Sequence, residues 1–343
     1  MNKNPHYVNY SIYYKKSKII NYKINLISIL TIEIFFIVIL YNYNGVMWVN
    51  IFRLHQYLIM KKYYSICKKN ICIEANNFPG DNPMWEQFET ENDSIDIEIN
   101  CNVIDPFPGM PGKCSETAGD FIVSVDGDTV YREFPMGTVD GALTKYTPAD
   151  TSYSETFFTK KSFPVMMDSR YMWNSISLSQ LLLPQNAFFI HSSYISVGGK
   201  AILFSAPCGT GKSTQAALWE KYRNAEVING DKAGILVENG VHACGVPFCG
   251  TSGICKSQNL PLGAIVFLSQ SPQNHAEKLC GTDALQKIMQ NIYLDFLAPN
   301  EKLKFVDLAI EIISSVPIYA FGCTPDEDAV ITLEKTLKSE GVI

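Results

Sequence analysis

The sequence predicts an α/β (α+β) protein in which a β-rich lobe precedes a domain built from both strands and helices. The chain has 343 residues, which is enough for two domains. Residues 61–190 contain segments with period-two alternation, such as Ser94–Asn100 and Phe121–Val125, separated by turn signals. Residues 185–343 contain apolar runs of strand length together with helical patterns. We therefore divide the chain into residues 1–59, a β-rich lobe at 60–184 and an α/β domain at 185–343.

The lobe is expected to be small and antiparallel. Asp126-Gly127-Asp128 predicts a hairpin turn, and Ser154–Thr159 and Pro164–Met167 are further candidate strands. Asn174–Leu183 has helical periodicity and is closed by Pro184.

The most informative stretch of the chain is Ala201–Trp219. A short apolar run, Ala201–Ser205, is typical of a buried strand, and a helical pattern follows from Thr214. Between them lies a loop with the pattern of a phosphate-binding loop, with alanine at its first glycine position. The residues of this loop are Ala206, Pro207, Cys208, Gly209, Thr210, Gly211, Lys212 and Ser213.

These residue types suit the binding of a nucleoside triphosphate. Backbone N–H groups in such a loop and at a helix N-terminus hold anionic phosphate oxygens, and glycines let the chain turn tightly. Lys212 can reach the β- and γ-phosphates, and the hydroxyl of Ser213 can bind Mg²⁺. We therefore expect Ala206–Thr214 to bind ATP with Mg²⁺.

Two titratable residues outside the loop are candidate site residues. Asp231 ends the short strand that follows the loop helix, where a carboxylate commonly holds Mg²⁺; the alternative is a turn former after Gly230. His191 lies in the apolar strand Phe188–Val197, so its position allows either a core residue or a site residue.

Composition restricts the class of protein. The formal net charge of −6 and the pI near 5.5 give no electrostatic footprint for nucleic acid. The ten cysteines show no paired CxxC spacing, which argues against a zinc site, and an ATP-using chain belongs in the reducing cytoplasm. We expect free thiols and a cytoplasmic protein.

Residues 1–59 differ in composition from the rest, since they contain no alanine and no aspartate. Within them, the apolar run at residues 24–41 is near the length that crosses a bilayer, so a single-pass membrane anchor is one interpretation. Lysines 15, 16, 18 and 23 precede the run, and this positive charge favours an N-terminus in the cytoplasm. That orientation would leave the phosphate loop outside the cell. The other interpretation is that synthesis begins at Met60.

Four segments together resemble the C-terminal catalytic domain of HPr kinase/phosphorylase and of related proteins with the phosphoenolpyruvate-carboxykinase-like fold. They are His191-Ser-Ser before the loop, Asn229-Gly-Asp231, the glycine-rich Gly245–Ile254, and Cys323-Thr-Pro-Asp326. The resemblance covers roughly residues 188–337. It implies that Ser213 and Asp231 bind Mg²⁺, that His191 lies near the acceptor, and that a serine-type hydroxyl of a protein or peptide receives the phosphoryl group.

This sequence departs from that family at one position. The HPr kinases carry two adjacent acids where this chain has Gly230-Asp231, so one acid is missing. Asp231, His191 and Lys212 are the candidate catalytic residues, and the acceptor and a homo-oligomeric state stay open. A non-catalytic nucleotide-binding accessory or regulatory protein is the main alternative. A small-molecule carboxykinase is a third, disfavoured because the chain has only four arginines.

Overall fold

The computed structural model describes residues 34–41, 47–54, 60–76, 78, 83–111, 115–118, 120–137, 139–166, 171–248, 250–294 and 298–343. The chain separates into two compact units, Met1–Leu58 and Ile59–Ile343. It is a mixed α/β protein with two mixed sheets and several helices.

In the first unit, β1 (Ile34–Tyr41) pairs antiparallel with β2 (Met47–Leu54). The second part of the apolar run at residues 24–41 is thus a strand, and residues 24–33 lie outside the described residues. Within the part of the chain that the structure describes, no helix combines the length and the apolarity needed to cross a bilayer.

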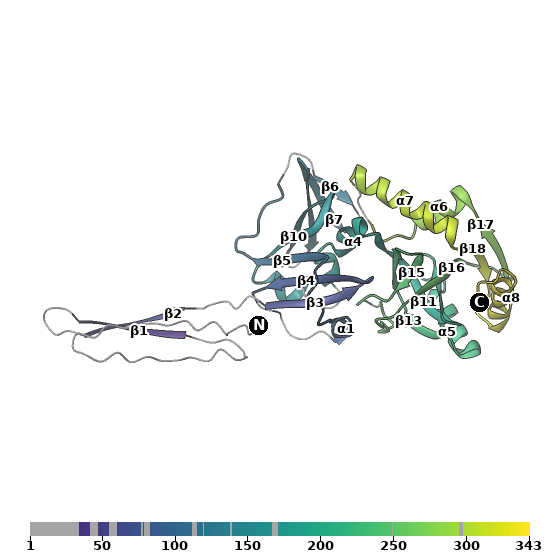
Figure 1. Ribbon diagram of the computed structural model, residues 1–343, viewed down its shortest axis with the longest axis horizontal. Helices are drawn as coiled ribbons and strands as arrows, with labels where there is room; N and C mark the ends of the chain where they lie inside the picture. Colours follow the sequence, from purple (N-terminus) through teal and green to yellow (C-terminus); the bar gives the residue numbers. More distant parts are fainter. Residues whose placement is uncertain are drawn as a thin grey trace, which may run out of the picture. The chain divides into compact units, whose positions relative to one another are not determined.

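The first large sheet, drawn in purple to blue in Figure 1, has the strand order β3-β4-β5-β10-β9-β8-β7-β6. Its strands are β3 (Met60–Ile66), β4 (Lys69–Ala75), β5 (Ile97–Val103), β6 (Ser115–Ala118), β7 (Phe121–Asp126), β8 (Thr129–Met136), β9 (Val139–Thr147) and β10 (Asp150–Phe158). The expectation of an antiparallel lobe is wrong for β5, which pairs in parallel with both β4 and β10. A parallel pair needs a crossover connection, and the chain between β4 and β5 supplies one that contains helix α1 (Pro83–Glu86).

The segment after β10 corrects two expectations. Pro164–Met167 was expected as a strand, but helix α2 occupies Ser162–Met166. Thr159 and Ser162 exchange backbone-to-side-chain hydrogen bonds of 2.9 and 3.1 Å at its start, and proline is tolerated in a first turn. The expected helix Asn174–Leu183 is divided into α3 (Met172–Ser175) and α4 (Leu178–Leu182) because Ser177 adopts a left-handed conformation with φ 51°.

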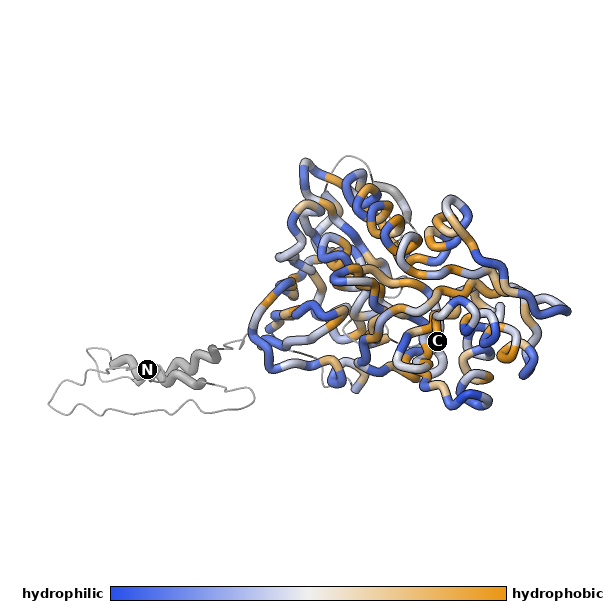
Figure 2. Tube along the Cα trace, turned by 45° about the vertical axis from the view of Figure 1, so that its right-hand side comes forward, coloured by the Kyte–Doolittle hydropathy of each residue, from blue (hydrophilic) through white to orange (hydrophobic). Residues whose placement is uncertain are grey.

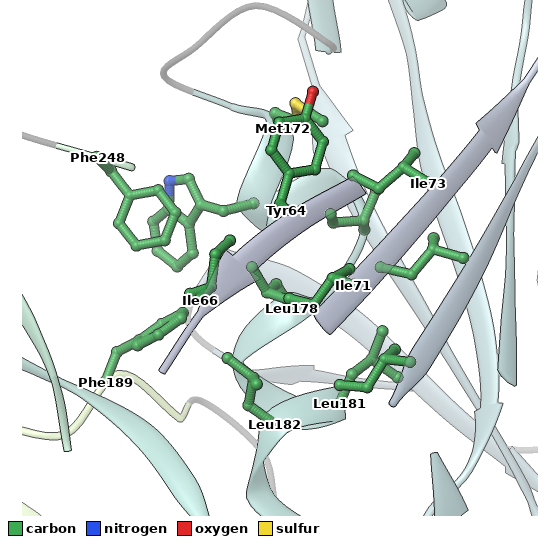
Figure 3. Close-up of a cluster of buried hydrophobic side chains, with 14 of the residues drawn as sticks. Tyr64, Ile66, Ile71, Ile73, Met172, Leu178, Leu181, Leu182, Phe189 and Phe248 are labelled. Atoms are coloured by element: carbon green, nitrogen blue, oxygen red, sulfur yellow. The ribbon is translucent and has the colours of Figure 1, made fainter. Parts of the chain in front are cut away.

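Helix α4 packs its leucines against β3 and β4. Leu178, Leu181 and Leu182 face Ile66 and Ile71 in a buried cluster that Phe189 and Phe248 also enter (Figure 3). The two sheets of this unit therefore share one hydrophobic core.

The second sheet has the order β12-β11-β14-β15-β16-β18-β17, and β13 pairs with β11. Its strands are β11 (Ala187–Val197), β12 (Lys200–Ser205), β13 (Glu226–Asn229), β14 (Lys232–Val237), β15 (Val241–Cys244), β16 (Asn259–Gln270), β17 (His275–Leu279) and β18 (Ile318–Cys323). Strand β12 also pairs in parallel with β16, which closes the pairings of β12, β11, β14, β15 and β16 into a ring.

Helices cover both faces of this sheet. Residues of α6 (Gly281–Met289) and α7 (Pro299–Ser315) pack in one buried cluster with β11, β14 and β16, and α5 (Lys212–Arg223) and α8 (Glu327–Ser339) pack in another with β12, β16 and β18. Figure 1 shows the two helix pairs on opposite sides of the strands, and Figure 2 shows hydrophobic residues concentrated along the strands. Helix α7 was not expected from the sequence, although Phe305, Leu308, Ala309 and Ile312 have the spacing of a buried helical face.

The eight cysteines that the structure describes are free thiols, as expected.

Candidate functional site

The loop between β12 and α5 has the conformation that its glycines allow. Gly209 and Gly211 have φ angles of 79° and 119°, which disfavour other residues, and Gly211 is the N-cap residue immediately before α5. No atom lies within 4 Å of where a Cβ would stand at either glycine, so the loop is open above them. The first backbone N–H groups of a helix have no intrahelical acceptor, and here they follow this open loop.

Lys212 folds back across the loop instead of extending into solvent. Its Nζ donates hydrogen bonds to the carbonyl oxygens of Ala206 at 2.8 Å and Pro207 at 3.3 Å, and the side chain is buried. Burial lowers the pKa of Lys212, and the negative charge of Asp231 opposes this shift. Ala206, at the first glycine position of the motif, is buried in the core beside α5, whereas Pro207, Cys208, Ser213 and Thr214 are exposed.

A turn after β13 holds Asp231 in place. The Oδ1 atom of Asn229 accepts hydrogen bonds from the backbone N–H groups of Asp231 and Lys232, at 2.9 and 3.0 Å. The Nδ2 of Asn229 donates to the carbonyl oxygens of Val246 and Phe248, at 3.2 and 2.7 Å. One fully buried amide therefore ties the aspartate to the glycine-rich loop.

Asp231 lies between an imidazole and an ammonium group. Its Oδ1 is 3.7 Å from Nδ1 of His191, and its Oδ2 accepts a hydrogen bond of 2.7 Å from Nζ of Lys232. Burial lowers the pKa of His191, the charges of Lys212 and Lys232 lower it further, and the charge of Asp231 opposes them. His191 is therefore held as a neutral imidazole near neutral pH, the form that accepts a proton.

Gly230 has no open space beside its Cα. A Cβ at Gly230 would stand 2.2 Å from Oγ and 2.7 Å from Cβ of Ser252, a residue of the glycine-rich loop. A Cβ at Gly250 of the same loop would lie 3.0 Å from the carboxylate of Asp231. The glycine-rich loop thus packs directly on the Gly230-Asp231 turn, and a side chain at either glycine would require its neighbours to shift.

Two cavities lie next to these residues. The first, of about 510 Å³, borders the loop between β12 and α5 and the ends of β16 and β18, and its lining includes Gly209, Thr210, Gly211, Thr214, Gln215 and Thr324. The second, of about 580 Å³, reaches Asp231 and Lys232 from the side of the β-rich lobe.

The structure brings together most of the residues that the sequence singled out. Lys212, His191 and Asp231 share one electrostatic environment, and Gly209–Gly211 with Thr214 line the first cavity. Within the described residues, no group of three or more His, Cys, Asp and Glu side chains is placed to hold a metal ion.

Sequence reasoning missed the roles of Asn229, Lys232 and the aromatic residues around the second cavity. Asn229 had a signal, because asparagine before Gly-Asp commonly bonds to backbone groups in a turn. Trp173 and Tyr293 gave no such signal, because they are far from Lys232 in the sequence. In the structure, Nζ of Lys232 is 4.9 Å from the ring centroid of Trp173 and 4.7 Å from that of Tyr293.

Comparison with known proteins gives a limited result. No protein-family model matches the chain, and no curated protein matches it. Among solved structures, the HPr(Ser) kinase/phosphatase from Coxiella burnetii is similar to 44% of this chain and 97% of its own, with 12% identity and a TM-score of 0.27.

Proposed function

We propose that this protein binds ATP with Mg²⁺ and transfers the γ-phosphoryl group to a serine-type hydroxyl of a protein or peptide. The observation that supports this most is the proximity of a strand-to-helix glycine loop to a buried lysine and an Asp231–His191 pair. A glycine loop at a helix N-terminus binds phosphates, and a carboxylate and a neutral imidazole nearby supply the groups that phosphoryl transfer needs.

The residues take the following roles in this proposal. Lys212 exchanges its two carbonyl partners for phosphate oxygens when the triphosphate enters the loop. The acceptor oxygen bonds to the γ-phosphorus, the bond from that phosphorus to the ADP oxygen breaks, and the hydroxyl proton passes to His191.

Ser213 and Asp231 provide one hydroxyl and one carboxylate, a donor set that fits Mg²⁺ when phosphate oxygens and water complete its coordination. Bound there, the ion would neutralise charge on the phosphates. Lys232 orients the carboxylate of Asp231 through their 2.7 Å contact.

The test combines a binding and a transfer measurement. Lys212→Ala should abolish the thermal stabilisation by MgATP, which for the wild type is about 2.7 kcal/mol at a hundred times the dissociation constant. Lys221→Ala, on the exposed part of the same helix, is the matched control and should respond to MgATP like the wild type. Incubation of the protein with γ-labelled ATP and a cell extract should label a protein or peptide, and this label should be missing with Lys212→Ala.

The second candidate function is a non-catalytic nucleotide-binding protein. It is favoured by Gly230, because Ser252 occupies the space that a second acid would need. Binding of MgATP without any labelled product in the extract would support this candidate over the kinase.

A further inference from the structure

The second cavity, which we name the aromatic pocket, is built from both domains of the unit. It is lined by Met84, Asp120, Phe134, Tyr171, Trp173, Asn174, Asp231, Lys232, Phe248, Gly250, Thr251, Gly253 and Tyr293. Among its lining residues, Trp173 contacts two other aromatic rings, with its ring centroid 4.5 Å from that of Tyr293 and 4.9 Å from that of Phe248. Ligand pockets of this volume are commonly apolar and aromatic, with a few polar groups that orient the ligand.

One polar group in this pocket lacks a partner. Asn174 is only 7% exposed, and its Oδ1 atom is buried and accepts no hydrogen bond from the described residues. A buried acceptor without a donor is unfavourable, so such groups are rare in proteins.

The charges of the pocket disfavour an acidic occupant. Asp120 and Asp231 contribute two carboxylates, and Lys232 offsets only one of them through its 2.7 Å hydrogen bond to Asp231. Lys232 is also positioned by the faces of Trp173 and Tyr293, which keeps the cation against the aromatic wall.

We propose that the aromatic pocket recognises the residue next to the acceptor serine, and that the acceptor is an extended peptide segment with a large apolar side chain at that position. This inference rests on the proposed kinase function, since Asp231 belongs both to the catalytic cluster and to the wall of the pocket. A side chain in the pocket places the adjacent serine hydroxyl at Asp231, which lines the same pocket.

The experiment uses three blocked peptides: Ac-Ala-Phe-Ser-Phe-Ala-NH₂, the same peptide with alanine in place of phenylalanine, and the same peptide with glutamate there. With the full chain and MgATP, kcat/KM for the phenylalanine peptide should exceed that for the alanine peptide by roughly tenfold or more, the gain from burying one aromatic side chain. The glutamate peptide should be the poorest acceptor. Calorimetric binding of the same peptides in the presence of MgADP should give the same order without requiring transfer.

Two variants assign the effect to the pocket. Tyr171→Ala removes a half-buried wall residue and should reduce the preference for phenylalanine over alanine severalfold while leaving MgATP affinity unchanged. Tyr153→Ala is the matched control, because Tyr153 is an exposed tyrosine of β10 that does not line the pocket, and it should keep the full preference.

Three results would overturn the inference. The first is that the enzyme uses the three peptides equally. The second is that the preference for phenylalanine survives Tyr171→Ala. The third is that the labelled product in the extract is a small molecule. If an extract protein is labelled but no peptide binds or reacts, the pocket inference fails and the kinase proposal stands. If nothing is labelled in the extract, the kinase proposal fails, and the calorimetric order of the peptides still reports on the pocket.

Discussion

Gly230 gives the sharpest test of how the glycine-rich loop packs on the site. A methyl group added there would stand 2.2 Å from Oγ and 2.7 Å from Cβ of Ser252, whereas ordinary contacts of a Cβ are 3.4 Å or longer. Gly230 is outside the left-handed region, so the backbone itself accepts alanine. The cost of Gly230→Ala therefore comes from the contact with Ser252.

The magnitude follows from this overlap. The Ser252 side chain cannot resolve it by rotating, because its Cβ is also too close, and the loop backbone has to move. Inserting a methyl group into a packed site costs typically about 1–3 kcal/mol, and about 2 kcal/mol lowers the melting temperature of a domain of this size by roughly 4–8 °C. The backbone hydrogen bond from Gly230 to Ile254, at 3.4 Å, would also be disturbed.

Urea unfolding of four proteins measures the effect: wild type, Gly230→Ala, Ser252→Gly and the double variant. Ser252→Gly removes both atoms in the way, so the double variant should recover most of the loss, with a coupling of at least about 1 kcal/mol. Gly109→Ala is the control, because no atom lies within 4 Å of its added Cβ. A change below about 0.5 kcal/mol for Gly230→Ala, or no recovery in the double variant, would refute this reasoning.

Three further predictions concern single side chains. Asp231→Asn should lose Mg²⁺-dependent ATP binding and transfer, whereas His191→Ala should keep ATP binding and lose roughly 10²–10⁴-fold in transfer rate; an unchanged rate would make His191 a core residue only. Because burial holds the pKa of His191 below its ordinary 6.5, the unfolded chain takes up this proton first as the pH falls. The free energy of unfolding should therefore decrease below about pH 6.5, and less so in His191→Gln when both are titrated by urea unfolding. Tyr146→Phe removes a 2.9 Å hydrogen bond to the buried carboxylate of Glu301 and should cost about 1–3 kcal/mol in the same assay, whereas Tyr153→Phe at the surface should cost almost nothing.

The local parts of the candidate site could be predicted from contiguous residues. The expected strand Ala201–Ser205 is found as Lys200–Ser205, and the helix expected from Thr214 begins two residues earlier, at Lys212. The type and order of these elements could be predicted because φ angles at Gly209 and Gly211 and the helix start are set by neighbouring residues. Strand Phe188–Val197 was predicted almost to its ends, since an apolar run bounded by a Gly-Gly turn has few alternatives.

Pairings between distant segments could not be predicted in this way. The parallel partners of β5 come from both sides of it in the sequence, and the break between α3 and α4 depends on a left-handed Ser177 for which serine gives no signal. Whether a segment forms a strand or a helix follows from its local periodicity. Which strand it pairs with, and whether the pair is parallel or antiparallel, follows from how the elements pack around the core.

By itself, the sequence determined a glycine loop joined to a helix, an aspartate soon after the next strand and a histidine in an apolar strand. Only the tertiary structure decided that Lys212 and His191 influence each other, that Lys232 holds Asp231, and that Ser252 fills the space beside Gly230. It also decided that Trp173 of the β-rich lobe and Tyr293 of the second domain form one aromatic wall. The physical reason is that charge, burial and steric contact act through space. Residues far apart in the chain therefore affect one another in these ways only once folding has packed the two sheets around a shared core.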